Sequence, residues 1–460
     1  MQFRTIETAQ TITKPSPSHQ QRLTRQTKIV GLGNLSLALH RLGSVPNEVP
    51  HPIHTISFIR IFVQQVQVIV CGAGPVGLVA GLRLARAGIE TLVIDKAPGV
   101  NEDFRASTFH PPTLEMLDEL GLTPDLMASG LEAPTWQIRR HESHDKALFD
   151  LSVLSGDTRY PFRLQCEQRV LTRLAHQKAQ STANLQLRYG AELTDLTQDE
   201  HGVKVTVQTA SGLQTLQARY LIAADGARSV CRKLTGMTFS GETYPETTIL
   251  ATTTYRFEDQ LPGLSQVNYV WCEQGTFSLL RLPDLWRCSL YCDPDESIDQ
   301  ALEPQAIERK LQRIVAREQP YEVLEIRPYR LHRRLIDDYR AGRVLFAGDA
   351  AHLTSPSGGM GMNGGIHDAF NLTDKMMAVL NEGAADELLN LYTHQRRPVA
   401  QDEILAQSHT NRMRMQRRDP AWRDAEMKRL QALIADPVTH RAHLLKSSMI
   451  SGLAQAALVS

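Results

Sequence analysis

The most regular pattern of apolar and polar positions lies between residues 66 and 96. Residues 66–71 (VQVIVC) are rich in β-branched side chains and predict a buried strand. Leu78–Ala87 has the periodicity of a helix that ends at Gly88, and Thr91–Ile94 predicts a second buried strand. A strand, a helix and a strand in this order are typical of a βαβ unit with a parallel sheet.

The rest of the chain alternates between helical and extended patterns. Short apolar segments separated by turns predict an antiparallel sheet from Thr247–Phe257, Gln266–Trp271, Thr276–Leu282 and Arg287–Cys292. Two further strands are expected at Tyr220–Ala223 and Arg343–Ala347. Helical periodicity predicts helices at Thr113–Leu120, Gln168–Gln177, Pro304–Arg317, Gly365–Leu380, Glu403–Met415 and Asp424–Ile434.

The turn after the first strand has the glycine spacing of a dinucleotide-binding loop. In this motif the first glycine allows a tight turn, the second lets a pyrophosphate approach the backbone, and the third lets the helix pack on the sheet. The helix N-terminus offers free N–H groups, and an acidic residue about 20 positions later can accept hydrogen bonds from a ribose. The sequence therefore predicts dinucleotide binding by Gly72, Gly74, Pro75, Val76, Gly77, Asp95 and Lys96.

Composition and charge exclude several classes of protein. The 460 residues include 50 Lys+Arg and 50 Asp+Glu, and this zero net charge argues against binding to nucleic acid. Six scattered cysteines without a C-x-x-C pair argue against a disulfide framework, and we predict no metal site. No run of apolar residues is long enough for a membrane-spanning helix.

Residues 1–62 differ from the rest of the chain. Basic side chains outnumber acidic ones there, prolines are frequent and no helical or alternating pattern persists. We interpret this stretch as a mobile extension or the product of a misplaced gene start. A mitochondrial transit peptide is the less favoured alternative, because such peptides are also Arg-containing, Ser-rich and poor in acids. A cytoplasmic location is therefore expected.

Three later segments identify the dinucleotide through a resemblance. Residues 221–229 (LIAADGARS), 342–352 (GRVLFAGDAAH) and 104–115 (FRASTFHPPTLE), together with the glycine loop, resemble in order and spacing the motifs of the class A flavoprotein monooxygenases of the para-hydroxybenzoate hydroxylase type. The resemblance covers about residues 63–400 and implies FAD as the cofactor.

The resemblance also implies roles for individual residues. Asp349 would bind the ribityl hydroxyls, with Gly348 before it, and Pro356 would lie beside the flavin near the carbon that reacts with oxygen, as the one candidate catalytic residue. His352 is expected to be structural. The remaining implied cofactor contacts are Arg105, Gln165, Asp225, Gly226, Gly358, Gly361, Met362 and Asn363.

Some of these residues have plain structural alternatives. Arg105 could be a surface arginine, Gln165 could cap or pack against the helix that follows, and Asp225-Gly226 could be an ordinary β-turn. The aromatic residues of the antiparallel sheet could line a substrate site or form its core. The local cluster of Arg412, Arg414, Arg417 and Arg418 is expected to be a solvated basic face.

The expected architecture is α/β, with α+β character in its substrate part. We predict a Rossmann-like FAD-binding domain from residues 63–125, 161–240 and 336–400, an inserted antiparallel-sheet substrate domain from 126–160 and 241–335, and a C-terminal helical segment at 401–460.

The activity implied by the resemblance is aromatic hydroxylation. NADH or NADPH would reduce the flavin, and molecular oxygen would add to give a flavin hydroperoxide that transfers one oxygen atom to a small aromatic, phenolic or similar substrate. An FAD-dependent epoxidase, a dehydrogenase on the same fold or a non-catalytic FAD-binding regulator are the alternatives, since fold alone does not separate them. The sequence also leaves a homodimer open.

Overall fold

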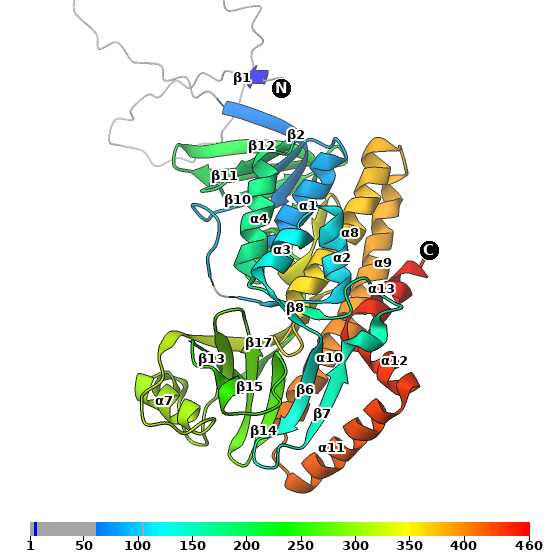
Figure 1. Ribbon diagram of the computed structural model, residues 1–460. Coiled ribbons are helices and arrows are strands. Elements are labelled where there is room, and N and C mark those ends of the chain that lie inside the picture. Colours follow the sequence, from blue (N-terminus) through cyan, green and yellow to red (C-terminus); the bar gives the residue numbers. More distant parts are fainter. Residues whose placement is uncertain (1–3, 7–60, 104) are drawn as a thin grey trace, which may run out of the picture.

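The computed structural model describes residues 4–6, 61–103 and 105–460. Two bodies, each built around a sheet, lie one above the other, with C-terminal helices along one side of both (Figure 1). Most of the extension predicted at residues 1–62 lies outside the described residues. Its described part includes strand β1 (Arg4–Ile6), which pairs with the start of β2, where no strand was expected.

The upper body is built around a sheet that has nine strands among the described residues. Besides β1 they are β2 (Ile61–Cys71), β3 (Thr91–Ile94), β9 (Leu185–Arg188), β10 (Glu192–Gln198), β11 (Val203–Thr209), β12 (Gly212–Ala223), β18 (Arg340–Ala341) and β19 (Val344–Phe346). The neighbours β12, β2, β3 and β9 run parallel, as does β19 beside β12. The end of β12 lies beside the end of β2, which brings the motif after each strand to one edge of the sheet.

Helices cover the parallel part of this sheet, which explains why its strands read as continuous apolar runs. Val68, Ile69 and Val70 are fully buried. The covering helices are α1 (Pro75–Arg86), α4 (Gln168–Gln180), α8 (Met360–Asn381) and α9 (Asn390–Val399). α1 begins three residues before the predicted start because proline is well suited to the first helical position.

The lower body contains the predicted antiparallel sheet, and it has eight strands in the described chain. They are β6 (Thr135–Arg140), β7 (Lys146–Asp150), β13 (Phe239–Thr253), β14 (Val267–Cys272), β15 (Gly275–Arg281), β16 (Trp286–Tyr291), β17 (Val323–Ile336) and β20 (His352–Leu353). One pair differs from the prediction, because β6 runs parallel to β14. The prediction also missed β17, whose several arginines and Pro328 hide the strand pattern.

A small three-stranded sheet joins the two bodies within the described residues. It contains β4 (Thr108–Phe109), β5 (Leu131–Ala133) and β8 (Arg163–Gln165). The remaining short helices are α2 (Pro111–Glu119), α3 (Thr123–Ser129), α5 (Val230–Leu234), α6 (Ile298–Ala301) and α7 (Pro304–Gln312). Because β8 pairs with both β4 and β5, residues of all three strands are fixed at the junction.

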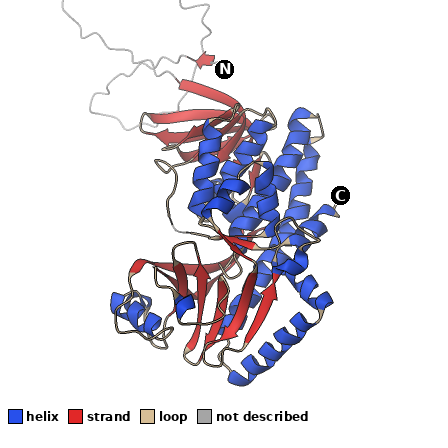
Figure 2. Cartoon of the chain, viewed as in Figure 1, coloured by secondary structure: helices blue, strands red, loops and turns tan. Residues whose placement is uncertain are grey.

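The first C-terminal helices pack against strands of the lower sheet (Figure 2), and the last one packs against α9 of the upper body. The C-terminal helices are α10 (Ala406–Gln416), α11 (Pro420–Ala435), α12 (Pro437–Ser447) and α13 (Ile450–Ala457), and a π-helical turn at Ala400–Leu405 joins α9 to α10. In their shared core, Trp136 stacks on Phe149 with ring centroids 3.9 Å apart, next to Met427, Leu430 and Leu444. The tail is therefore packed against both bodies.

Two expectations about helices were wrong. The segment before Gly365 was expected to be a loop, but α8 already begins at Met360. Arg412 and Arg414 were expected on a solvated face, but Arg412 is 7% exposed and pairs with Glu246, and Arg414 pairs with Glu426. Arg412 is buried and Arg414 is partly buried because α10 packs on β14 and β15, whereas Arg417 and Arg418 are exposed as expected.

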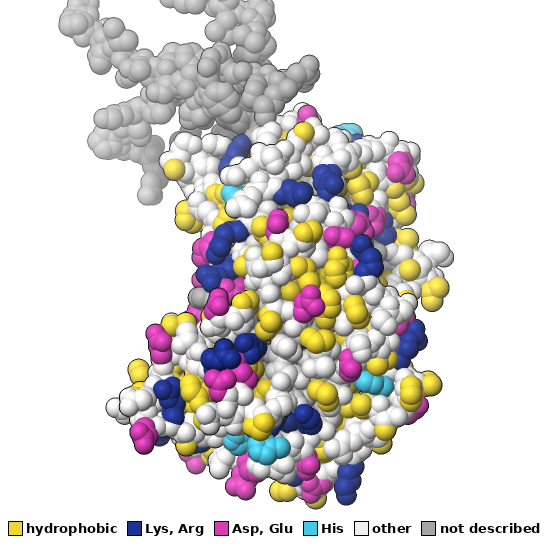
Figure 3. Space-filling view, in the orientation of Figure 1, with side chains coloured by type: hydrophobic (Ala, Val, Ile, Leu, Met, Phe, Trp, Pro, Cys, Tyr) yellow, Lys and Arg dark blue, Asp and Glu magenta, His cyan; other side chains and the backbone are white. Residues whose placement is uncertain are grey.

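The surface agrees with the balanced composition. On the face in Figure 3, positive and negative side chains are interspersed, and apolar side chains gather near the middle. Among the described residues, no helix is both long enough and apolar enough to cross a membrane.

Candidate functional site

The glycine loop between β2 and α1 has a backbone that other residues could not adopt. Gly72 has φ +110°, and a Cβ on it would lie 2.3 Å from the carbonyl oxygen of Ala224. A Cβ on Gly77 would lie 1.9 Å from the carbonyl oxygen of Gly72. The loop is therefore closed tightly on itself and on the end of β12, as predicted for Gly72 and Gly77.

Gly74 differs from these two glycines because a Cβ on it would meet no atom within 4 Å. It caps the start of α1 without a side-chain hydrogen bond, and Pro75 and Val76 follow. The first N–H groups of α1 consequently face open space with the positive end of the helix dipole behind them. Such an arrangement suits a phosphate group.

Asp95 at the end of β3 closes the other side of this loop. Its carboxylate accepts hydrogen bonds from the backbone N–H of Ala73 at 2.7 Å and of Ala97 at 2.8 Å. A carboxylate has about four acceptor positions, so two bonds leave capacity for a ribose hydroxyl. Lys96 is exposed beside it.

Asp225 and Gly226 follow β12 in a turn. One carboxylate oxygen of Asp225 accepts hydrogen bonds from the N–H groups of Val230 at 2.7 Å and Cys231 at 3.1 Å, while its other oxygen, Oδ1, is buried without a partner. Gly226 has φ +78°. A carboxylate oxygen of Asp225 and the Sγ atoms of Cys71 and Cys231 all lie within 4.8 Å of one another. The turn thus has a structural role and keeps one acceptor free.

The Gly348–Asp349 turn packs directly on α1 and α8. Gly348 has φ +63°, and a Cβ on it would lie 3.1 Å from Val76 Cγ2. A Cβ on Gly365 would lie 2.6 Å from the same methyl group and 2.9 Å from Gly348 Cα. The three segments meet without room for another methyl group, so their relative positions are fixed by contact.

A buried cluster of charged and polar side chains contacts the Gly348–Asp349 turn on its inner side. Asp368 on α8 accepts hydrogen bonds from Gly348 N at 3.1 Å and Arg396 Nε at 2.8 Å, and its Oδ2 lies 2.8 Å from His352 Nε2. The side chains of Asp368, His352 and Arg396 are fully buried. Burial opposes ionisation of Asp368, but Arg396 and His352 outweigh it and lower its pKa to about 2. His352 is placed in a structural position.

Asp349 itself points away from this cluster. Its side chain is exposed, yet the surrounding protein raises the pKa of its carboxyl group, while the charges of His352 and Arg105 lower it. Arg105 is 54% exposed and lies 3.6 Å from Asp103. An exposed carboxylate with a cation nearby can accept hydrogen bonds from a polyol chain.

Gln165 is fully buried on β8. Its Oε1 accepts a hydrogen bond from the Thr108 hydroxyl at 3.1 Å, and its Nε2 has no partner in the described structure. A buried amide N–H without an acceptor costs about 1–3 kcal/mol, so such groups normally bind a ligand or water. The alternative of capping is not supported, because α4 begins without a side-chain cap.

Gly361, Met362 and Asn363 lie in the first turn of α8, whose start at Gly359 has no side-chain cap. The side chain of Asn363 donates to Thr108 O at 2.8 Å and accepts from His110 N at 2.9 Å. This side chain is thus used within the protein. The backbone N–H groups at the start of α8 remain available to a ligand.

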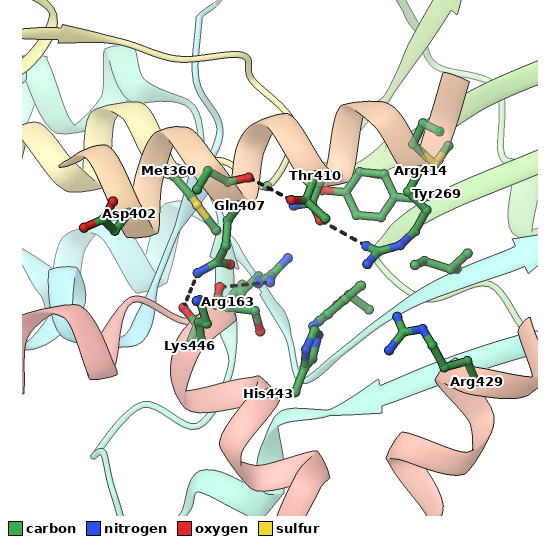
Figure 4. A pocket seen from close by; sticks show the side chains of 17 residues that line it. Arg163, Tyr269, Met360, Asp402, Gln407, Thr410, Arg414, Arg429, His443 and Lys446 are labelled. Carbon is green, nitrogen blue, oxygen red and sulfur yellow. Dashed lines mark hydrogen bonds between the residues drawn. The ribbon is translucent and has the colours of Figure 1, made fainter. Parts of the chain in front are cut away.

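The loop that carries Pro356 and Gly358 borders a cavity of about 310 Å³. Pro356 is exposed and its carbonyl accepts from Gly359 N at 2.9 Å, whereas Gly358 and Met360 line the cavity directly. The opposite walls come from β6, β8, β14 and the helices α10, α11 and α12 (Figure 4). Of the sheet aromatics, Trp136 and Tyr269 line the cavity, while Phe277 and Trp286 belong to the core.

Two arginine side chains that connect the segments around the site were not predicted from the sequence. Arg287, buried on β16, donates to Arg105 O at 2.7 Å and pairs with Glu167 at 2.8 Å. Arg232 donates to Ala350 O at 2.9 Å and to Ala227 O at 2.8 Å. Both connect segments more than a hundred residues apart, and no local pattern marks such contacts.

These features fit FAD. A dinucleotide with a polyol chain and a polar ring requires hydrogen-bond donors and acceptors together with room for its phosphates. The donors are the uncapped N-termini of α1 and α8 and the unpaired amide of Gln165, and the acceptors are the free oxygen of Asp225 and the exposed Asp349. The open space at Gly74 leaves room for the phosphates.

Residues 65–406 match the model of a protein family described as an FAD binding domain. The chain belongs to this family. A para-nitrophenol 4-monooxygenase of Pseudomonas sp. (strain WBC-3) is 33% identical over 390 residues, which cover 84% of this chain and 96% of that protein. A pentachlorophenol 4-monooxygenase of Sphingobium chlorophenolicum is 30% identical over 382 residues, which cover 80% and 70% of the two chains.

Solved structures agree. The crystal structure of the p-nitrophenol 4-monooxygenase PnpA from Pseudomonas putida DLL-E4 superposes with a TM-score of 0.79 at 31% identity, covering 85% of this chain and 98% of that chain. The resemblance to class A flavoprotein monooxygenases is thereby confirmed, together with the α/β fold, its Rossmann-type FAD domain and FAD as the cofactor. This FAD-binding protein is a flavoprotein oxidoreductase of the monooxygenase type.

Removing the charge of Asp368 is expected to destabilise the protein strongly. Asp368→Asn leaves Arg396 buried without its counter-ion, which costs about 3–5 kcal/mol of the free energy of unfolding. Because the pKa of Asp368 is lowered, wild-type stability from this group is present above about pH 4 and lost as the pH falls towards 2. Urea unfolding measures the loss. Asp374→Asn, which removes an exposed carboxylate of the same helix, is the control and should change little.

His110 makes a second prediction about acid stability. Burial and the nearby charge of Arg163 lower its pKa to about 3, while the unfolded value is about 6.5. The unfolded chain therefore binds this proton first, and stability falls below about pH 6.5 by up to about 1.4 kcal/mol per pH unit. Unfolding at pH 7 and pH 5 should show a smaller loss for His110→Gln than for the wild type. An unchanged loss would contradict the assignment, and His201→Gln, which replaces an exposed histidine, serves as the control.

Proposed function

We propose that this flavoprotein hydroxylates a small phenolic substrate at the cavity beside residues 356–360, with electrons from NADH or NADPH. The observation that carries the proposal is the position of the cavity. Its wall includes Gly358 and Met360 at the start of α8, where backbone N–H groups can face a bound ring. The relatives that act on nitrophenol and pentachlorophenol support a phenolic substrate.

Bound FAD supplies electron transfer from the nicotinamide cofactor and the activation of oxygen. The chain supplies binding and orientation. Gly74 and the start of α1 hold the pyrophosphate, Asp95 holds the adenosine ribose, and Asp349 holds the ribityl chain. Arg105 and Asp225-Gly226 hold further polar parts of the cofactor.

A second group of residues binds the ring end of the cofactor. The orphan amide of Gln165 donates to a polar edge of the ring, and the dipole of α8 stabilises negative charge that develops there. Gly361, Met362 and Asn363 contribute backbone groups, and Pro356 shields the ring from water on the side of the loop. Exclusion of water protects reactive oxygen species from side reactions.

An epoxidase, a dehydrogenase or a regulator on the same fold remains the competing class. The cavity of the described structure has no feature that favours them, and the relatives include monooxygenases of two phenols. The cytoplasmic location, a homodimer and the absence of a nucleic-acid partner stay predictions from the sequence, as do the domain limits.

The purified protein should show the two visible absorption bands of a flavin and oxidise NADH or NADPH faster when a phenol is present. We expect 4-nitrophenol or a related phenol to stimulate oxygen consumption and to yield a hydroxylated product. Oxygen electrode traces and product chromatography measure both. A colourless protein that takes up no added FAD, or a flavoprotein that no phenol stimulates, would overturn the proposal.

Asp349→Ala is expected to release FAD. Loss of a hydrogen bond to a charged acceptor costs about 1.5–3 kcal/mol, which weakens retention roughly 10- to 100-fold. The dissociation constant can be measured from the recovery of flavin fluorescence on dilution. Asp337→Ala removes another exposed carboxylate and should keep full FAD content. Equal retention by the two variants would show that Asp349 does not hold the cofactor.

A further inference from the structure

The cavity beside α8 contains an arginine whose charge has no counter-ion. Arg163 on β8 is 3% exposed and lines the cavity. Within the described chain no carboxylate lies within ion-pair distance of it, since its contacts are the Ser447 carbonyl at 3.5 Å, the Tyr269 hydroxyl and the Trp136 ring at 5.0 Å. Its Nε is buried without a partner.

The other cations of the cavity each have a carboxylate partner. Arg414 lies 2.9 Å and Arg429 2.7 Å from Glu426, and Lys446 lies 3.6 Å from Glu403. Asp402, the one carboxylate in the cavity wall of the described structure, is exposed and makes no ion pair with Arg163. Within the described structure, Arg163 is therefore the cation of the cavity wall that has no carboxylate partner.

A buried charge without a partner is costly, and proteins normally pair such groups or use them to bind a ligand. The effect of the free charge on its surroundings is visible in His443, which lines the same cavity. Burial, then Arg414 and Arg163, lower the pKa of His443 to about 4, so the imidazole is neutral near pH 7 and cannot repel a second cation or neutralise an anion. Neither the indole of Trp136 nor the imidazole of His443 carries a negative charge that could pair with Arg163.

The rest of the cavity suits a flat ring. Trp136, Ile138 and Tyr269 form apolar walls, and the indole of Trp136 already carries Arg163 against one face and Phe149 against the other. Figure 4 shows Arg163 and His443 on the side of α12, facing Tyr269 and Arg414 across the space. A volume of about 310 Å³ is at the low end for ligand pockets and fits one or two rings.

We infer that the cavity binds a one- or two-ring aromatic anion, namely an aromatic carboxylate, whose negative group is paired by Arg163. This inference rests on the proposed function, because it names the substrate class of the same site. A guanidinium presents a planar fork of donors that matches a carboxylate. The free Nε and the adjacent N–H groups provide this fork.

The wall that completes this site comes from the C-terminal helices. Thr410, Arg414, His443 and Ser447 lie beyond residue 406, where the match to the family model ends. The Ser447 carbonyl fixes one edge of the Arg163 guanidinium. Substrate selection is consequently divided between β8 and the helical tail.

The test compares matched ligands on the FAD-loaded protein without turnover. Visible difference spectra and calorimetry give dissociation constants for benzoate and benzamide, 4-hydroxybenzoate and 4-hydroxybenzamide, and 4-hydroxyphenylacetate and its amide, each pair differing in charge but hardly in size. We expect at least one anion to bind about tenfold or more tightly than its amide. If no anion binds more tightly than its amide, or none binds at all, the inference is wrong.

Arg163→Met, Arg163→Lys and Arg159→Met assign the effect to one side chain. The methionine variant should lose roughly 30-fold or more in anion affinity and little in amide affinity. The lysine variant should recover part of the anion affinity through its charge. Arg159→Met removes an exposed arginine of the same segment and should behave as the wild type. Equal weakening of anion and amide by Arg163→Met would indicate a purely structural role and overturn the inference.

The two proposals fail in different ways. FAD content and thermal unfolding of each variant show whether it is folded, and the comparison of wild-type ligands does not depend on any variant. A protein that binds aromatic anions but never oxidises NADH or NADPH would contradict the proposed function alone. A hydroxylase that prefers neutral phenols would contradict the Arg163 inference alone.

Discussion

The cofactor site depends on the buried contacts of the Asp368 carboxylate. This carboxylate lies fully buried between Arg396, His352 and the backbone N–H of Gly348, so one side chain connects α8, α9 and the Gly348–Asp349 turn. Burial opposes ionisation of this carboxylate, but its contacts with Arg396 and His352 outweigh burial and keep it ionised. The turn is thereby held with Asp349 directed to the outside, before any cofactor is bound.

Close contact between glycines completes this fixation from the opposite side. Gly348 and Gly365 approach Val76 so closely that no additional methyl group would fit, and Gly77 lies directly on Gly72. The glycine loop, the Gly348–Asp349 turn and the start of α8 therefore form one packed unit. Their backbone donors are arranged in advance, which lowers the entropic cost of binding a large cofactor.

The sequence predicted the parts of this site that depend on local rules. The loop from Gly72 to Gly77 and Asp95 follow from spacing within one βαβ unit, and the later motifs follow from the family resemblance. The start of α8 at Met360, the strand β17 and the burial of Arg412 were not predicted, since each depends on packing between distant segments. Arg163 was missed for the same reason, because the absence of a counter-ion is a property of the folded cavity.

Buried charges are arranged differently at the cofactor loops and in the cavity. At the Gly348–Asp349 turn, the buried carboxylate of Asp368 is paired with the buried guanidinium of Arg396. In the cavity, Arg163 keeps its charge uncompensated between an indole and a backbone carbonyl, at a cost that the fold must bear in the free protein. Binding of an anion beside Arg163 would offset this cost. The helices after residue 406 seal this position from solvent, which makes the attraction for an anion stronger than it would be at a surface.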